Sequence, residues 1–280
     1  ASWGPEDWPS AGCCRDGPRD MIPVGDDNSK NRRTPVVTRL LLALNIAAFV
    51  LLQQCGTDPN IPRSLGAVPQ ELIQGQDIRT ADQVIRSPTT GRTYRVPGLL
   101  ETPVWIYLTV LTAMFLHGST GHILGNLLYL GIFGDNVENR MGPLRFLLFY
   151  LIMGAAATAA QVLASIVTGQ GLLTPMIGAS GAISGVMGAY LVLFPRNRVY
   201  ILTFGFYPMP VSAWFALGIW FLMQLVSASA AGPAGSGVAY AAHIGGFAAG
   251  WLWARIFEAG DSRRRGRGGR DGDITWRIVD

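Results

Sequence analysis

Hydrophobic residues are concentrated in six long stretches of the chain, and short polar segments separate these stretches. About 20 apolar residues in a helix match the thickness of the hydrocarbon core of a bilayer. The pattern therefore predicts an all-α fold, a polytopic membrane protein built as a bundle of six transmembrane helices. The predicted spans are residues 36–53, 121–133 with an extension through 137, 143–167, 179–194, 211–226 and 238–257.

Polar segments flank these spans. Residues 1–35 are rich in Pro, Gly and Asp, and we expect them to form a mobile N-terminal tail. Residues 259–280 carry six arginines, and we expect a disordered basic C-terminal tail. The membrane domain is then residues 36–258. A cleaved signal peptide would also give a first apolar run, but this run begins far from the start of the sequence, so we expect it to be retained.

The first outer loop, residues 56–120, is mostly polar. Within it, residues 103–116 are apolar but too short to span a bilayer. Trp105 and Tyr107 have amphipathic rings, so we expect this stretch to lie at the membrane interface. Further along, residues 199–210 are expected to lead into the fifth span through a kink at their prolines. Residues 227–237 contain mostly Ser, Ala and Gly, which suits a mobile cap.

Composition and charge agree with a membrane protein. Hydrophobic residues make up 49% of the chain and charged residues only 14%, well below the usual quarter or so. Arginines at the two ends and in two interhelical turns account for most of the net charge of +4, so we interpret it as an orientation signal. We expect both termini in the cytoplasm, the lipid bilayer as surroundings and no nucleic-acid partner. The three cysteines form no disulfide or metal-binding pattern.

Four polar side chains are predicted near one depth, toward the outer face. His122 and Asn126 open the second span, Ser180 opens the fourth, and His243 lies just inside the sixth. His122 and Asn126 are one helical turn apart, so both can point at one place. Ser180 begins a helix, where backbone amides lack intrahelical acceptors, and free amides beside a hydroxyl can form an oxyanion hole.

The absence of acids narrows the chemistry. There is no Asp or Glu from residue 139 to 257, nor from residue 102 to 134. This excludes an aspartyl dyad, an HExxH metalloprotease, a carboxylate proton relay and a Ser-His-Asp triad. A metal site at His117 and His122 lacks a third ligand, so we expect no metal and no cofactor. A transporter would need midplane ionisable groups or paired broken helices, and we find neither. A serine–histidine pair remains.

Small residues indicate how this pair can meet. Glycines recur at helical spacing on the fourth span and, after His243, on the sixth span. Such stripes allow two membrane helices to approach backbone to backbone. We therefore expect the two helices to pack with His243 against Ser180. The glycines concerned are Gly181, Gly185 and Gly188 on the fourth span and Gly246 and Gly250 on the sixth.

Four short motifs follow one another along the chain: HGSTGHILGN at residues 117–126, VENRMG at 137–142, GASG at 178–181 and AHIGGFAAG at 242–250. With these motifs in this order, the sequence resembles the rhomboid family of intramembrane serine proteases. The resemblance covers about residues 36–258. It implies a six-helix rhomboid-like membrane domain that cleaves transmembrane segments of other membrane proteins through an acyl-enzyme. The six-span layout also indicates a bacterial plasma membrane, and the orientation given by the arginines places the expected active site toward the outer face.

The resemblance also implies a role for each motif residue. Ser180 is implied as nucleophile and His243 as general base, with His122, Asn126 and the Ser180 amide around the oxyanion. Supporting roles fall to residues of the nucleophile loop, of the helix contact and of a structural brace after the second span. These are Gly178, Gly181, Gly246, Gly250, Glu138, Arg140 and Gly142.

Two departures from the family pattern stand out. Many members have a Trp-Arg pair in the first loop, whereas Trp105 is followed here by Ile106. Many also stack an aromatic residue on the histidine, four positions after the nucleophile, and this position is Ser184 here. We therefore expect the histidine to be held less firmly. The alternative function is that of a rhomboid-like pseudoprotease, which binds client membrane helices without cleaving them.

Overall fold

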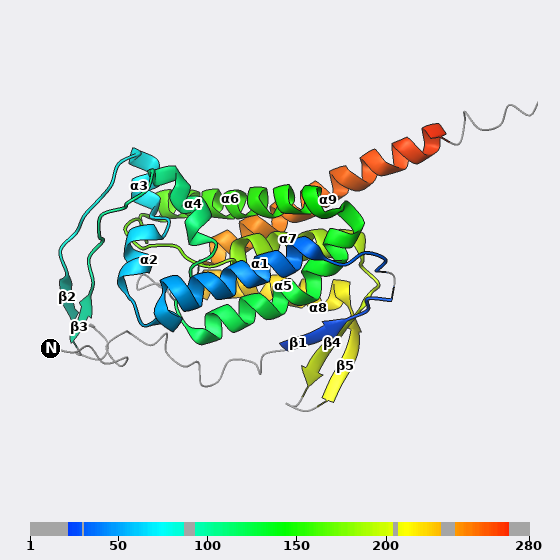
Figure 1. Ribbon diagram of the computed structural model, residues 1–280, viewed down its shortest axis with the longest axis horizontal. Coiled ribbons are helices and arrows are strands. Elements are labelled where there is room, and N and C mark those ends of the chain that lie inside the picture. Colours follow the sequence, from blue (N-terminus) through cyan, green and yellow to red (C-terminus); the bar gives the residue numbers. More distant parts are fainter. Residues whose placement is uncertain (1–21, 30, 87–92, 204–206, 231–238, 269–280) are drawn as a thin grey trace, which may run out of the picture.

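Long helices lie side by side in the computed structural model (Figure 1), which describes residues 22–29, 31–86, 93–203, 207–230 and 239–268. Helix α7 is central and packs against α5, α6, α8 and α9. The long helices are α1 (Val36–Ala47, continued by a π-helical turn Ala48–Leu52), α5 (Thr120–Met141), α6 (Pro143–Thr168), α7 (Ser180–Leu193), α8 (Ala213–Ala230) and α9 (Tyr240–Gly268).

These helices differ in length and in hydropathy, the two properties that decide whether a helix can span a membrane. By length and hydropathy, α6 alone among the described helices is sufficient to cross a bilayer. Three other apolar helices are shorter: Val36–Leu52, Ser180–Leu193 and Ala213–Ser229. The helical bundle agrees with the prediction, and the number of six membrane spans stays a prediction.

Two small sheets correct the expectation of an all-α fold. Strands β1 (Ile22–Asp26), β4 (Arg198–Thr203) and β5 (Tyr207–Ser212) form an antiparallel sheet in the order β1-β4-β5, and β2 (Gln83–Arg86) pairs with β3 (Thr93–Val96). The described part of residues 199–210 thus belongs to the paired strands β4 and β5 and is not a kinked entry to the fifth span. Val199 and Ile201 alternate inward and are buried. The prolines lie on β5, an edge strand, where a missing amide costs no ladder bond.

Strand β1 also changes the picture of the N-terminal tail, because residues 22–26 pair with β4. The Asp26 carboxylate anchors this strand to the bundle: it accepts hydrogen bonds from Tyr190 Oη and from Asn136 Nδ2, each at 2.6 Å. Burial raises the pKa of Asp26 to about 6. At the other end of the chain, α9 continues through Gly268, into the segment expected to be disordered.

Short elements gather at the end of the bundle opposite the β1-β4-β5 sheet (Figure 1). They include the β2-β3 hairpin, α2 (Asn60–Leu65), α3 (Pro69–Gln74), a 3₁₀ turn (Ile106–Leu108) and α4 (Thr109–Ala113). In the segment expected at the interface, Trp105 and Tyr107 pack edge to face at 5.0 Å and remain 68% and 46% exposed. Such exposed aromatic rings suit headgroup depth.

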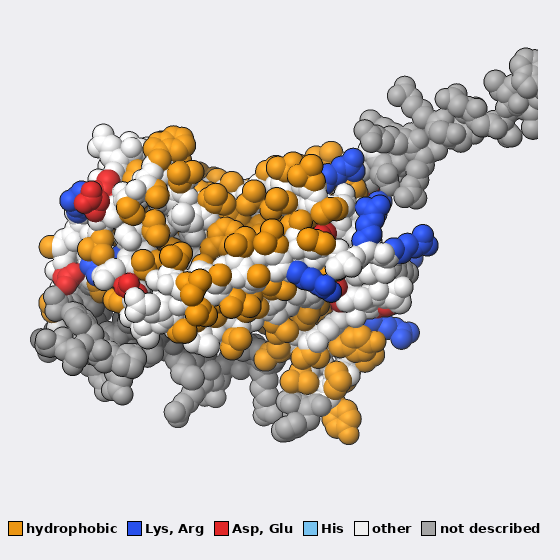
Figure 2. All heavy atoms as spheres, viewed as in Figure 1, with side chains coloured by type: hydrophobic (Ala, Val, Ile, Leu, Met, Phe, Trp, Pro, Cys, Tyr) orange, Lys and Arg blue, Asp and Glu red, His pale blue; other side chains and the backbone are white. Residues whose placement is uncertain are grey.

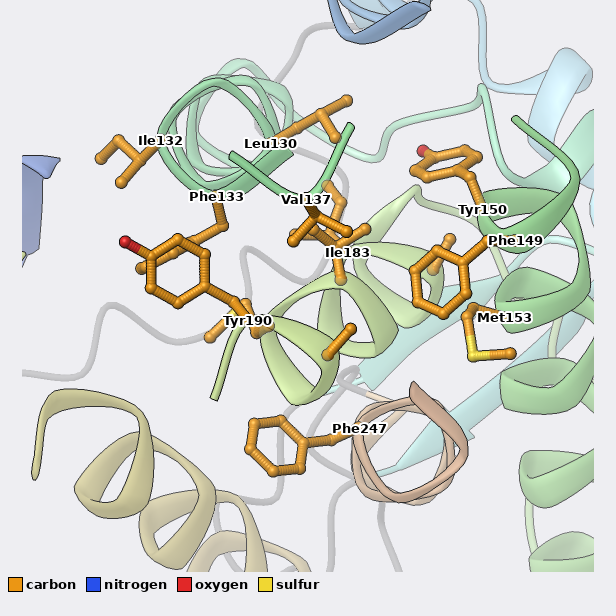
Figure 3. Close-up of a cluster of buried hydrophobic side chains, with 14 of the residues drawn as sticks. Leu130, Ile132, Phe133, Val137, Phe149, Tyr150, Met153, Ile183, Tyr190 and Phe247 are labelled. Atoms are coloured by element: carbon orange, nitrogen blue, oxygen red, sulfur yellow. The ribbon is translucent and has the colours of Figure 1, made fainter. Parts of the chain in front are cut away.

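The core lies around α7 (Figure 3). Phe133 of α5 and Tyr190 of α7 meet edge to face at 5.0 Å. On the other side, the glycines of α7 meet those of α9 so closely that a Cβ at Gly246 would overlap the carbonyl oxygen of Gly181, and one at Gly250 that of Gly185. The predicted backbone-to-backbone contact of the two helices is therefore confirmed.

The face of the molecule seen in Figure 2 carries a belt of apolar side chains along the helices. Arginine side chains gather at the end of the bundle from which α9 extends. An apolar belt of this kind suits the bilayer core, and a basic end suits the side with anionic headgroups. Exposed members of the belt include Leu40, Leu44, Leu51, Leu148, Leu163, Ile166, Leu222, Val226, Leu252 and Ile256.

Candidate active site

Ser180 is the first residue of α7 and follows a loop that holds it at the helix end. The amide of Gly178 donates to the Ala113 carbonyl at 2.8 Å, which fixes this loop on α4. Gly178 has φ +119°, a conformation that residues with a Cβ rarely adopt. No side chain caps the start of α7. Its first backbone amides therefore lack intrahelical acceptors beside the Ser180 hydroxyl.

His243, in the first turn of α9, meets this hydroxyl. Its Nε2 lies 2.8 Å from Ser180 Oγ, a good hydrogen-bond distance. The glycine contact between α7 and α9 positions both side chains, which are half-buried. The structure thus brings together the two residues predicted to meet, in a geometry that permits proton transfer between them.

His122 lies on the other side of the nucleophile loop. Ser119 Oγ caps α5 by accepting from the His122 amide at 3.1 Å. The His122 Nδ1 accepts from the Gly118 amide at 3.4 Å, which leaves Nε2 as the protonated nitrogen of a neutral imidazole. A Cβ added to Gly178 would lie 2.7 Å from this Nε2. The donor nitrogen of His122 therefore borders the loop that holds Ser180.

Asn126 follows one turn further along α5, on the same face as His122. It is 7% exposed, and its Nδ2 is a buried donor without a hydrogen-bond partner among the described residues. A buried polar group left unpaired costs free energy, which a ligand oxygen can recover. Asn126 is thus suited to a donor role that substrate completes.

Glu138 and Arg140 hold helices together at the far end of α5. The Glu138 carboxylate is 3% exposed and accepts from the Val37 amide at 2.9 Å and from the Thr38 amide and hydroxyl at 2.7 Å each. It therefore caps the start of α1, which has no side-chain cap of its own. Arg140 pairs with Glu258 of α9 at 3.7 Å. Both residues brace the bundle away from Ser180.

Sequence reasoning missed the residues that hold His243 from α8. The Oε1 atom of Gln224 lies 2.9 Å from His243 Nδ1. The Trp220 ring packs beside the imidazole, at 6.2 Å between ring centroids and a 38° tilt. The expectation of a loosely held histidine was therefore wrong. Ser184, at the position of the missing aromatic residue, is buried and donates to the Ser180 carbonyl at 2.7 Å.

Other predicted features play a smaller part. His117 is buried and packs edge to face on His122 at 5.1 Å, and the described residues contain no group of three or more His, Cys, Asp or Glu that could hold a metal ion. Most of the segment expected to form a mobile cap, at residues 231–238, lies outside the described residues.

The apolar helical bundle, its basic end and the half-buried serine–histidine contact define a helical membrane protein with a candidate nucleophilic site. The family model described as the Rhomboid domain matches residues 104–259, more than half of the chain. The chain therefore belongs to the rhomboid family, and the resemblance of its motifs is confirmed. Membership of this family makes the chain an integral membrane protein.

Curated relatives agree with this assignment. The chain is 33% identical over 162 residues to the RHOMBOID-like protein 12, mitochondrial, of Arabidopsis thaliana, covering 53% of this chain and 46% of the relative. It is 29% identical over 170 residues to Rhomboid protein 1, mitochondrial, of Saccharomyces cerevisiae, covering 58% and 46%. It is 30% identical over 174 residues to the Rhomboid protease GluP of Bacillus subtilis, covering 61% and 27%.

The chain thus spans less than half the length of these relatives. They include mitochondrial proteins of a plant and a fungus as well as a bacterial one. They therefore do not support our expectation of a bacterial plasma membrane.

Proposed function

We propose that this chain is an intramembrane serine endopeptidase that cleaves transmembrane segments of other membrane proteins through a Ser180–His243 dyad. The single observation that carries the proposal is the 2.8 Å contact between Ser180 Oγ and His243 Nε2. Membership of a family that includes a bacterial protein named as a protease supports it. The exposed apolar side chains along the helices suit a bilayer, in which such a substrate lies.

The dyad performs acyl transfer in two halves. His243 Nε2 takes the proton of Ser180 Oγ as the oxygen attacks the scissile carbonyl carbon, and the imidazolium then protonates the leaving amine as the C–N bond breaks. The product is an ester between Ser180 and the acyl half of the substrate. His243 next takes a proton from water, which attacks the ester and releases the carboxylic acid and free Ser180.

Oxyanion stabilisation comes from donors that surround the nucleophile loop. In the proposed mechanism, the His122 Nε2–H, the Asn126 amide and the Ser180 backbone amide donate to the oxygen that becomes negative during attack. The unpaired Nδ2 of Asn126 and the tautomer of His122 support this role. Each donor is worth about 10²–10³ in rate.

A cavity beside Ser180 supports a preference for a small residue before the scissile bond. Small side chains make up much of its wall, among them Gly154 and Ala157 of α6 and Ala242 of α9. A bulky side chain would overlap these walls, because protein interiors leave few voids. The proposed substrate is a membrane helix that unwinds readily near a small residue. In this proposal the site faces the side of the membrane opposite the basic end of the bundle.

Cleavage of a single-span model substrate by the purified protein tests the proposal. Wild type is expected to cleave it, whereas Ser180→Ala and His243→Ala are expected to be inactive. The matched control is Ser184→Ala, which removes a hydroxyl one turn further along α7 and is expected to keep activity. A wild type that binds the substrate as tightly as Ser180→Ala but leaves it intact would favour the alternative, a client-binding pseudoprotease.

A further inference from the structure

We propose that Gln224 is a positioning residue that holds His243 in the orientation and tautomer needed to accept the Ser180 proton. The inference rests on the proposed function and names a third member of the site, supplied by α8. It begins from the 2.9 Å contact between Gln224 Oε1 and His243 Nδ1. Gln224 does not touch the reacting atoms and acts through the imidazole.

Hydrogen bonds at both ring nitrogens and an aromatic neighbour hold the imidazole ring of His243 in place. Nε2 meets Ser180 and Nδ1 meets Gln224, so rotation of the ring about its bond to Cβ would break both hydrogen bonds. The Trp220 ring packs beside the imidazole in a tilted arrangement and is itself stacked on Phe247 of α9, at 5.9 Å and 29°. The position of His243 therefore depends on α8 as much as on its own helix.

The chemistry of the amide selects the tautomer. An amide oxygen accepts hydrogen bonds and cannot donate them, so Gln224 Oε1 opposite Nδ1 places the proton of the neutral imidazole on Nδ1. Nε2 then has a free lone pair toward the Ser180 hydroxyl. The same oxygen still accepts from Nδ1–H when the imidazolium forms. An amide turned the other way would donate to Nδ1 and put the proton on Nε2, which could then not act as base.

A neutral acceptor suits this location. In triad proteases a buried carboxylate orients the histidine and fixes its tautomer. This chain has no Asp or Glu from residue 139 to 257. A charged group inside the bilayer is costly, whereas an amide costs less and can be satisfied by one partner. Gln224 thus orients the histidine as the carboxylate does in a triad, but it brings no charge into the bilayer.

The tautomer of His243 is the direct readout. The chain has three histidines, so the ring nitrogens of ¹⁵N-histidine-labelled protein can be assigned by single substitutions. We expect His243 to be protonated on Nδ1 in wild type and in Gln224→Glu, which keeps an acceptor oxygen. In Gln224→Met, which keeps the shape and removes the acceptor, we expect a mixture of tautomers. An unchanged spectrum in Gln224→Met overturns the proposal.

A matched control uses the same substitution on a neighbouring helix. Gln161 of α6 also contacts α9, but its Oε1 accepts from the Ala242 backbone amide at 3.3 Å. Gln161→Met therefore removes a glutamine acceptor beside His243 without touching the imidazole, and the tautomer is expected to stay as in wild type. A tautomer change in Gln161→Met equal to that in Gln224→Met would assign the effect to helix packing and overturn the specific role of Gln224.

Kinetics separate this proposal from the protease function. We expect Gln224→Met to lower kcat about three- to tenfold, the value of one neutral hydrogen bond, with KM unchanged, and Gln224→Glu to restore kcat. If wild type cleaves and neither kcat nor the tautomer depends on Gln224, the positioning role fails and the protease stands. If wild type cleaves nothing while the tautomer depends on Gln224, the positioning is supported and the protease function fails.

Discussion

Gly178→Ala, in the nucleophile loop, tests how the oxyanion site is built. The residue has φ +119°, and a Cβ there would lie 2.7 Å from His122 Nε2 and 2.8 Å from His122 Cε1. Real Cβ atoms do not approach other heavy atoms so closely, so the imidazole or the loop must move. Either movement displaces the His122 donor relative to Ser180.

Two costs follow from this geometry. A residue with a Cβ held in a sparsely populated backbone region costs about 1–3 kcal/mol of folding free energy. Displacement of one oxyanion donor costs about 10²–10³ in kcat. We therefore expect Gly178→Ala to lose roughly 10²-fold or more in kcat and a few degrees in Tm, with a small change in KM because the donor acts mainly in the transition state.

The assay compares kcat, KM and Tm of this variant with those of Gly118→Ala. Gly118 flanks His122 on its other side, but a Cβ there would meet Ile177 at 3.6 Å and His122 Nδ1 at 4.0 Å, both ordinary contacts. We expect this control to behave as wild type. If Gly178→Ala kept kcat within about threefold of Gly118→Ala, the account of the oxyanion site would be refuted.

Three further predictions concern the remaining donors and the braces. Asn126→Ala should lower kcat about 10²–10³-fold in the cleavage assay, and a loss below fivefold would exclude it as an oxyanion donor. Glu138→Ala should cost about 3 kcal/mol or more in a denaturant titration, since it leaves three donors at the start of α1 unpaired, whereas Glu258→Ala should cost at most about 1 kcal/mol. The folded-state pKa of Asp26 is about 6, above its usual 3.8, so its contribution to stability is full below pH 4 and is lost as the pH rises through 6. The Tm of Asp26→Asn relative to that of wild type should therefore rise from pH 4 to pH 7. A Tm difference that does not change with pH would contradict this.

The sequence predicted the central contact because its determinants are local. Glycines at helical spacing required a close approach of α7 and α9, and the positions of Ser180 and His243 at the starts of those helices placed both at one depth. His122 and Asn126 share a face of one helix, so their common direction also followed from spacing alone. These features depend only on the geometry of a single helix or on one pair of glycine stripes on two neighbouring helices.

Gln224 and the β1-β4-β5 sheet depend on information that no local pattern contains. Gln224 is the one strongly polar residue in the apolar run 213–226, which was a usable signal, but its partner depends on the rotation of α8 about its own axis. Strand β1 pairs with a segment some 170 residues away, and the alternating burial of Val199 and Ile201 was hidden among apolar neighbours and prolines. Long-range pairing of this kind is set by the packed bundle.

Covalent trapping tests the central claim most directly, because a fluorophosphonate reacts with a serine whose hydroxyl is activated by a base. The modified residue and its rate of modification can be measured by mass spectrometry of the purified protein, in wild type, His243→Ala and Ser184→Ala. The account predicts a single adduct on Ser180 in wild type and in Ser184→Ala, and at least a 10²-fold slower reaction in His243→Ala. An adduct that forms equally fast without His243, or none on Ser180 in wild type, would contradict it.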